Sequence, residues 1–151
     1  MPTDMQSRRG LTGPTESDDS GNWIYAGHYD PEFKAAVCAD LDDLARLDPN
    51  WDLFGAPRIR PEVIAAAKQL VNALPEYIAF RPSIVPVPNG TLQLEWHEGP
   101  KTLELEFEDG NTIRYLQWNP TLGIEEEDSC ASNDLPKAVE LIQWFMRGLC
   151  V

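Results

Sequence analysis

The chain has 151 residues, of which 42% are hydrophobic, and its formal net charge is −13. This length predicts a single domain, and the hydrophobic content is sufficient for a buried core and excludes global disorder. The negative charge argues against direct binding to nucleic acid or to anionic membranes, and it is compatible with a basic protein partner, a cation, mimicry of nucleic acid or simple solubility.

The three cysteines, Cys38, Cys130 and Cys150, are widely spaced and include no Cys-x-x-Cys pair. An odd number of cysteines without a signal peptide indicates free thiols in a reducing compartment. No apolar run approaches the roughly 20 residues that a membrane-spanning helix needs. The sequence therefore predicts a cytoplasmic protein.

The composition of the chain changes near residue 22. Residues 1–22 are rich in Ser, Thr, Gly, Pro and Asp, which predicts a flexible tail, and residues 23–151 are expected to form one α+β domain. The aromatic cluster that begins at Trp23 is expected to pack on this domain as a short extended arm, with Leu116 and Trp118 as candidate contacts.

Three segments carry apolar residues at helical spacing, and we expect helices over residues 30–47, 61–74 and 134–149. Asp30 and Pro31 suit the N-cap and the first helical position of the first helix. The expected buried stripe of the third helix comprises Leu135, Val139, Ile142, Phe145, Met146 and Leu149.

Between the first two helices, the stretch from Asn50 to Pro57 places aromatic residues among polar, Gly and Pro residues. Trp51 and Phe54 in such a stretch need either burial or a ligand. One interpretation is a structural loop, in which Asn50 and Asp52 bond to neighbouring backbone amides. The other interpretation makes Trp51 and Asp52 part of a binding site.

Residues 91–97 and 102–108 alternate apolar and polar residues, and residues 112–118 are a third strand candidate that follows a turn, which together predicts three antiparallel strands. The proline-rich residues 81–88 must be extended and are a candidate edge strand, because proline excludes helix and removes backbone donors. The acidic residues 125–128 are expected to form a loop because they repel one another. The predicted fold class is α+β: a three- to four-stranded antiparallel meander packed on two or three helices, in the order α-α-β-β-β-α.

Turn lengths fix the expected register of the meander. A two-residue turn at Gly99 and Pro100, with a positive φ at the glycine, sets Glu95 opposite Glu104. A three-residue loop over residues 109–111, with one residue in the left-handed region, keeps the apolar residues of the following strands on one face.

This register arranges the outward face of the meander in three rows. The rows are Gln93, Glu106 and Arg114; Glu95, Glu104 and Leu116; and His97, Thr102 and Trp118. The opposed carboxylates of Glu95 and Glu104 destabilise the sheet by about 0.2–1 kcal/mol. Leu116 and Trp118 are unusual on a solvated face, and they predict that another part of this chain or a partner covers them.

The outward face also offers ligands for a divalent cation, since Glu95 and Glu104 supply carboxylates and His97 supplies an imidazole. The paired carboxylates can raise one pKa and so supply a general acid. The structural alternative is a solvated face whose acids oppose aggregation. The sequence holds no phosphate-binding glycine loop, zinc-spaced Cys/His set or nucleophile motif, and it predicts no cofactor.

Two motifs together resemble a family of small, uncharacterised bacterial proteins. The motifs are a loop, Asn50-Trp51-Asp52-x-x-Gly55-Ala56-Pro57, and a strand, Gly90-x-Leu92-Gln93-Leu94-Glu95-Trp96. The resemblance covers about residues 41–115 and departs at Leu53, where the family pattern has Gly. It implies a bacterial or phage-related cytoplasmic protein, and it implies no activity.

These features predict a non-enzymatic interaction module that binds another, basic protein. The candidate binding residues are Trp51, Asp52, Glu95, His97, Glu104, Arg114, Leu116 and Trp118. A narrower form is an inhibitor of the basic partner, similar in role to an antitoxin or an immunity protein. The alternatives are a metal-dependent enzyme that uses Glu95, His97 and Glu104, and a sensor with a small-ligand pocket between Trp51 and the sheet.

Overall fold

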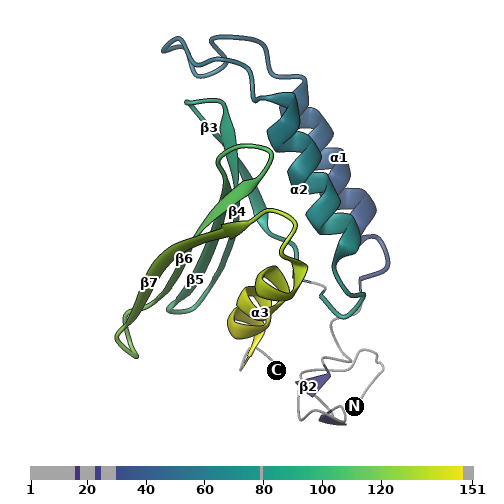
Figure 1. Ribbon diagram of the computed structural model, residues 1–151, viewed down its shortest axis with the longest axis vertical. Helices are drawn as coiled ribbons and strands as arrows, with labels where there is room; N and C mark the ends of the chain where they lie inside the picture. Colours follow the sequence, from purple (N-terminus) through teal and green to yellow (C-terminus); the bar gives the residue numbers. More distant parts are fainter. Residues whose placement is uncertain (1–15, 18–22, 25–29, 79, 148–151) are drawn as a thin grey trace.

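The computed structural model describes residues 16–17, 23–24, 30–78 and 80–147. Within these ranges, two helices are followed by the strands of one large sheet and then by a third helix, which confirms the predicted α+β class and element order. The predicted count of three to four strands is wrong, because this sheet has five. The helices of the described chain all lie on one side of the sheet (Figure 1), so its other side is open.

Helices α1 (Phe33–Ala45) and α2 (Pro61–Ala73) lie side by side on one side of the sheet, at the right of Figure 1. Pro61 begins α2, as predicted, because the first backbone N–H of a helix has no intrahelical partner and its absence does no harm. Each helix turns one apolar stripe inward. The buried residues are Phe33, Val37 and Leu41 of α1 and Val63, Ile64, Ala66, Ala67, Leu70 and Val71 of α2.

Asp30 does not cap α1, contrary to the prediction. The helix begins at Phe33 with Glu32 as its N-cap residue and with no side-chain cap. The Asp30 carboxylate accepts the backbone N–H of Glu32 at 3.2 Å, before the helix begins, and two hydrogen bonds from Arg81, with Nε–Oδ2 and Nη2–Oδ1 distances of 2.6 and 3.0 Å. A bidentate guanidinium–carboxylate pair combines two charge-assisted hydrogen bonds. This pair ties the start of α1 to the chain before β3 (Ser83–Val87) and holds the pKa of Asp30 below its ordinary value.

We expect Asp30→Asn to reduce the acid sensitivity of the fold. Because the folded-state pKa of Asp30 is lowered, the pair stabilises the protein above the unfolded pKa of about 3.9. That stabilisation is lost as the pH falls through the folded-state pKa. The free energy of unfolding of the wild type should therefore fall more steeply than that of the variant between about pH 5 and pH 3. Urea unfolding at several pH values measures both slopes, and equal slopes would contradict the prediction.

The large sheet is an antiparallel meander in which every strand pairs with the next in the chain. After β3 come β4 (Thr91–Glu98), β5 (Lys101–Phe107), β6 (Thr112–Asn119) and β7 (Ile124–Ala131). The predicted register is confirmed, with Glu95 opposite Glu104 and Phe107 opposite Ile113. Gly99 has a φ of +56°, as its turn requires. The predicted proline-containing edge strand is β3.

The loop between β5 and β6 has the predicted length but a different conformation. The N–H of Glu108 donates to the carbonyl of Thr112 at 3.0 Å, which encloses three residues. Neither Gly110 nor Asn111 has the expected left-handed backbone. One carboxylate oxygen of Asp109 instead accepts the backbone N–H groups of Asn111 and Thr112 at 2.7 and 2.8 Å. A side-chain turn therefore replaces the left-handed residue.

The acidic run that was predicted to be a loop is strand β7, so this prediction is wrong. Alternation sends Glu125 and Glu127 to the open face and Glu126 and Asp128 to the helix side. All four carboxylates are exposed at the edge of the sheet, where water weakens their repulsion. The preceding turn ends at Gly123, whose φ is +70°.

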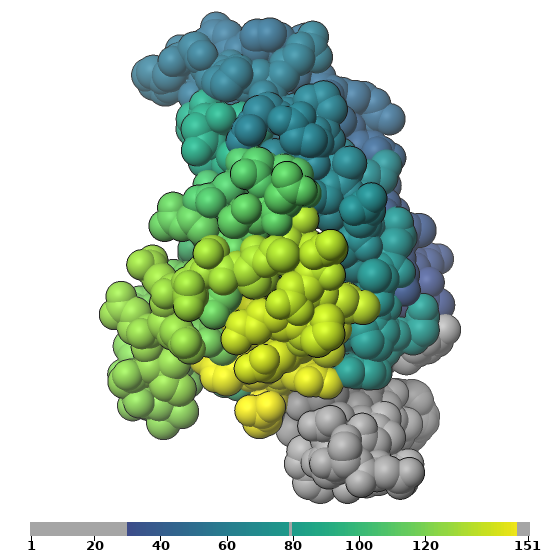
Figure 2. Space-filling model, in the orientation of Figure 1, coloured from purple at the N-terminus to yellow at the C-terminus, as the bar shows by residue number. Residues whose placement is uncertain are grey.

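Helix α3 (Leu135–Met146) fills the space between the strands and α2 (Figure 2). The Asp134 carboxylate accepts the backbone N–H of Lys137 at 3.1 Å, which confirms the predicted helix start. Leu135 and Val139 are only partly buried, so the buried stripe differs from the predicted one, and Leu149 lies outside the described residues. The buried side chains of α3 are Ala138, Leu141, Ile142, Phe145 and Met146.

The predictions for the N-terminal region lie largely outside the described residues. The predicted tail contains β1 (Glu16–Ser17), which pairs antiparallel with β2 (Trp23–Ile24). The predicted contact of the Trp23 arm with Leu116 and Trp118 involves the side chains of the arm, which lie outside the described part of the structure. In the described ranges, no helix is long and apolar enough to span a membrane.

Candidate functional site

The open face is the surface formed by the sheet side chains that point away from the helices. Residues opposite each other in the register share a face, so strand pairing fixes its membership. No described segment covers it (Figure 1). The open face comprises Ser83 and Val85 of β3, Gln93, Glu95 and His97 of β4, Thr102, Glu104 and Glu106 of β5, Arg114, Leu116 and Trp118 of β6, and Glu125, Glu127 and Ser129 of β7.

The three predicted rows of side chains are present on this face. The predicted binding residues that they bring together are Glu95, His97, Glu104, Arg114, Leu116 and Trp118. The other two, Trp51 and Asp52, lie in the connection between α1 and α2 and take no part in the open face.

Glu95 and Glu104 are opposite each other but have different surroundings. Glu95 accepts a hydrogen bond from Gln93 (Nε2–Oε2, 2.5 Å), and its Oε1 lies 3.5 Å from Nε2 of His97. Glu104 forms no ion pair with a described residue. Partial burial, and after it the charge of Glu95, raise the pKa of Glu104 above its ordinary value. The charged form of Glu104 is therefore disfavoured, and a cation brought to this point would relieve it.

We expect Glu104→Gln to raise the free energy of unfolding at neutral pH, because glutamine keeps the shape and removes the disfavoured charge. A carboxyl group with a raised folded-state pKa destabilises above that pKa, and the penalty disappears below the unfolded pKa of about 4.3. The difference between variant and wild type should therefore shrink toward zero below about pH 4. Urea unfolding at pH 7 and below about pH 4 measures this difference in the free energy of unfolding.

Glu140→Gln is the control for this experiment, since the Glu140 carboxylate lies 3.7 Å from the ammonium of Lys137. Removing a charge that has a cation beside it should not stabilise the fold. A Glu104 variant that is no more stable than the wild type at pH 7 would contradict the prediction.

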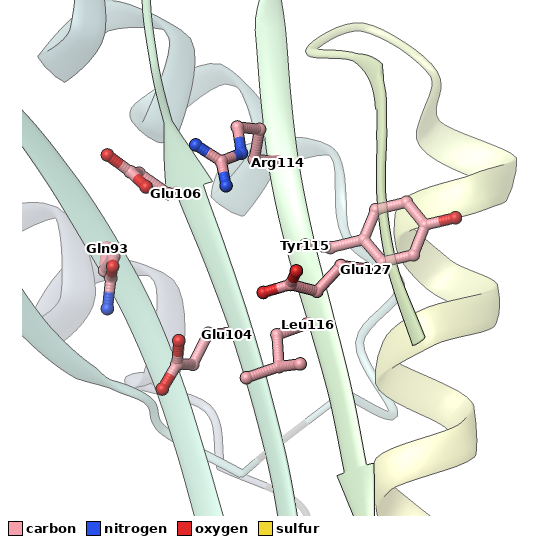
Figure 3. Close-up of a pocket in the computed structure, with 7 residues that line it drawn as sticks. All are labelled: Gln93, Glu104, Glu106, Arg114, Tyr115, Leu116 and Glu127. Atoms are coloured by element: carbon pink, nitrogen blue, oxygen red, sulfur yellow. The ribbon is translucent and has the colours of Figure 1, made fainter. Parts of the chain in front are cut away.

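A hollow of about 60 Å³ opens on the face beside Glu104 (Figure 3). The Arg114 guanidinium borders it but forms its ion pair with Glu108, at 3.3 Å. The carboxylates of Glu104 and Glu127 border the hollow without a paired cation among the described residues. Tyr115 points away, toward α3. The lining residues are Gln93, Glu104, Glu106, Arg114, Tyr115, Leu116 and Glu127.

Leu116 and Trp118 lie two residues apart on the open side of β6, where Leu116 is partly exposed and 43% of Trp118 is exposed. In the register, Leu116 lies between Glu104 of β5 and Glu127 of β7. Trp118 lies beside Glu125 of β7. Two apolar side chains are thus held in water with carboxylates close to them, which is a surface that a binding partner can bury.

Glu125 and Glu127 are the residues of this face that the sequence analysis missed. The acidic run was predicted to be a loop, because a strand with charges on both sides lacks the usual alternation of apolar and polar residues. A signal was nevertheless present. Ile124 and Cys130 lie on the helix side at even spacing, directly after the turn at Gly123.

Glu95, His97 and Glu104 are the residues of the alternative metal site. In the part of the chain that the structure describes, no group of three or more His, Cys, Asp and Glu side chains is placed to hold a metal ion. Nδ1 of His97 lies 3.0 Å from the hydroxyl of Thr102 on the neighbouring strand. This geometry gives no reason to prefer an enzyme over a binding surface.

Trp51 and Asp52 make their contacts within their own loop. Nε1 of Trp51 donates to the carbonyl of Pro57 at 2.9 Å, and the Trp51 side chain packs against the core. One Asp52 oxygen accepts the backbone N–H groups of Phe54 and Ala56 at 2.8 and 3.0 Å, which lowers the pKa of Asp52. These contacts favour the structural interpretation of the loop over a binding role for the two residues.

The exposed side chains of the loop are Leu53 and Phe54, with exposed fractions of 81% and 92%. Leu53 has a φ of +66°, in the left-handed region that glycine adopts most easily. It occupies the position at which the family pattern has Gly. The N–H groups of Phe54 and Ala56, which follow Leu53, donate to Asp52, which precedes it, and these hydrogen bonds hold the leucine in a conformation that it does not favour.

Comparisons with known proteins found no matching family model, no matching curated protein and no matching solved structure. The resemblance of the Trp51 loop and the Glu95 strand to a bacterial family stays a prediction. The case for a function therefore rests on the geometry of the open face.

Proposed function

We propose that the protein is an interaction module that binds a basic protein through its open face. The observation that carries the proposal is the exposure of Leu116 and Trp118 among carboxylates, on a sheet face that no described segment covers. Burying the two apolar side chains supplies affinity, because removing apolar surface from water is favourable by about 25 cal/mol per Å². The surrounding carboxylates restrict the partner to one that brings positive charge.

The charge of the chain supports the same kind of partner. With a net charge of −13, the protein attracts basic surfaces over a distance of about one Debye length, or 8 Å at physiological salt. Arg114 is already paired with Glu108, so it does little to offset the acids of the open face. Blocking a functional basic surface on the partner would make the module an inhibitor, in the manner of an antitoxin or an immunity protein.

We expect the double variant Leu116→Ser/Trp118→Ser to lose the partner while keeping the fold. The purified, full-length protein is immobilised, used to capture proteins from a lysate of the organism that encodes it, and compared with the variant. The captured protein is then purified and titrated against both. Affinity should fall with increasing salt, because exposed charges steer the association.

The matched control is Leu53→Ser/Phe54→Ser, which removes a leucine and an aromatic residue that are also exposed but lie outside the open face. The control should bind like the wild type. Capture that persists in the Leu116/Trp118 variant, or that is lost equally in both variants, would refute the proposal. Circular dichroism and urea unfolding verify that each variant is folded.

A further inference from the structure

We propose that the segment of the partner that binds the open face is a basic amphipathic helix lying along β6. Its apolar stripe covers Leu116 and Trp118, and its lysine or arginine side chains reach the carboxylates on both sides. This inference rests on the proposed function and adds the shape and charge pattern of the partner.

The edges of the sheet are poorly suited to an added strand, which is the other common way for a sheet to bind a peptide. At one edge, Pro86 lies within β3 and Pro82 and Pro88 lie next to its ends, so this edge lacks several N–H donors. At the other edge, β7 carries charges on both sides, including Glu126 and Asp128 on the helix side. Prolines and inward-pointing charges are the features that prevent strand addition. A partner therefore approaches the face.

The dimensions of the open face suit one helix. Leu116 and Trp118 are two residues apart on β6, which separates them by about 6.7 Å, close to the roughly 5–6 Å between neighbouring side chains on one face of a helix. Strands β5 and β7 lie about 4.8 Å to either side of β6, so their outward side chains are about 10 Å apart. An α-helix is about 10–12 Å wide including its side chains, and it spans this distance.

The charges of the face favour a helix with cations on both flanks. Glu104 lies beside Leu116 on the β5 side of the apolar pair, with Glu106 one row further along, and Glu127 and Glu125 lie on the β7 side. The hollow beside Glu104 gives a long cationic side chain room to approach its carboxylate. A narrow apolar stripe with lysine or arginine on each side is the complement of this pattern.

A second copy of the chain does not provide that complement. Two open faces brought together would place Glu104, Glu127 and their neighbours against the same carboxylates of the other copy. Like charges at an interface are unfavourable by several kcal/mol. The partner is therefore a different protein.

The test uses a synthetic peptide of leucine and lysine of about 18 residues, with leucines at the spacing of a helical stripe, long enough to form a helix on binding. The control peptide has the same composition but strictly alternates leucine and lysine, the pattern of a strand. Calorimetric titration into the full-length protein should show saturable binding of the helical peptide and at least about tenfold weaker binding of the alternating one. Equal binding of the two peptides would overturn the inference.

Two pairs of variants locate the binding. Glu104→Gln/Glu127→Gln should weaken the helical peptide by about tenfold, whereas Glu76→Gln/Glu140→Gln removes the same charge from exposed positions outside the open face and should weaken it much less. Leu116→Ser/Trp118→Ser should abolish the saturable binding, and Leu53→Ser/Phe54→Ser should preserve it. Equal effects within the first pair would show attraction by net charge alone, and equal effects within the second would show that binding does not depend on the open face; either result would overturn the inference.

The failures of the two proposals can be told apart. If the captured partner depends on Leu116 and Trp118 but the helical peptide does not bind, the proposed function stands and the helical partner is refuted. If capture is independent of both residues, the proposed function itself fails.

Discussion

Replacing Phe107 with alanine is expected to lower the free energy of unfolding by about 3–5 kcal/mol, as truncation of a buried aromatic side chain does. Phe107 is fully buried, and it lies opposite Leu92 on β4 and Ile113 on β6. Its removal leaves a cavity between the sheet and the helices that close-packed neighbours cannot fill. A single domain is stable by about 5–15 kcal/mol, so this one change removes a large part of the total.

Phe54→Ala is the matched control, because it removes the same atoms from a side chain that is 92% exposed. Surface substitutions of this kind change stability by no more than about 0.5 kcal/mol. Urea unfolding followed by circular dichroism gives both values. A Phe107 variant that loses less than about 1 kcal/mol would show that the sheet and the helices do not share one close-packed core.

Replacing Lys101 with methionine should lower the free energy of unfolding by about 1.5–3 kcal/mol, the range for hydrogen bonds that involve a charged group. The Lys101 ammonium donates to the carbonyl oxygens of Trp144 and Arg147, at 2.8 and 2.5 Å, and lies 3.3 Å from that of Phe145. The last carbonyls of a helix have no intrahelical partner and carry partial negative charge. Burial lowers the pKa of Lys101, but its hydrogen bonds require the protonated amine.

Lys137→Met is the control for Lys101, since Lys137 lies in the first turn of the same helix, where a positive charge opposes the helix dipole. Its ammonium lies 5.3 Å from the centre of the Tyr115 ring and contributes about 1 kcal/mol at most at a partly exposed site. Urea unfolding compares the two variants. Equal losses would contradict a specific role for Lys101 at the end of α3.

The register of the central strands could be predicted because two independent signals agree. Alternation assigns each residue to a face, and turn length then fixes which residues lie opposite each other, as for Glu95 and Glu104. Strand β7 lacks the first of these signals, the alternation of apolar and polar residues. Glu126 and Asp128 occupy positions where an inner strand has apolar residues, and both are exposed because β7 is an edge strand. The outward acids of β7, Glu125 and Glu127, were therefore missed.

Some features depend on contacts between residues that are separated in the sequence, and local sequence patterns could not predict them. Asp30 has the local sequence of a helix cap, but Arg81, 51 residues away, takes its carboxylate. Trp51 stands in a loop composition that suits a ligand site as well as a structural one. Only the carbonyl of Pro57, which accepts its indole N–H, distinguishes the two. The predicted positions of Leu116 and Trp118 needed no such contact, since the register set by the loop over residues 109–111 and the alternation of side chains along a strand place them on the outward face.

That alternation also shapes how such a protein can diversify. Ile113 and Tyr115 of β6 are buried in the core, whereas Arg114 and Leu116 between and beside them face outward. If the open face binds a partner as proposed, mutations at the outward positions alter recognition and leave the scaffold intact, because they do not disturb the buried contacts. Relatives that have adopted new partners should therefore differ at every second residue of the strand and agree at the residues between.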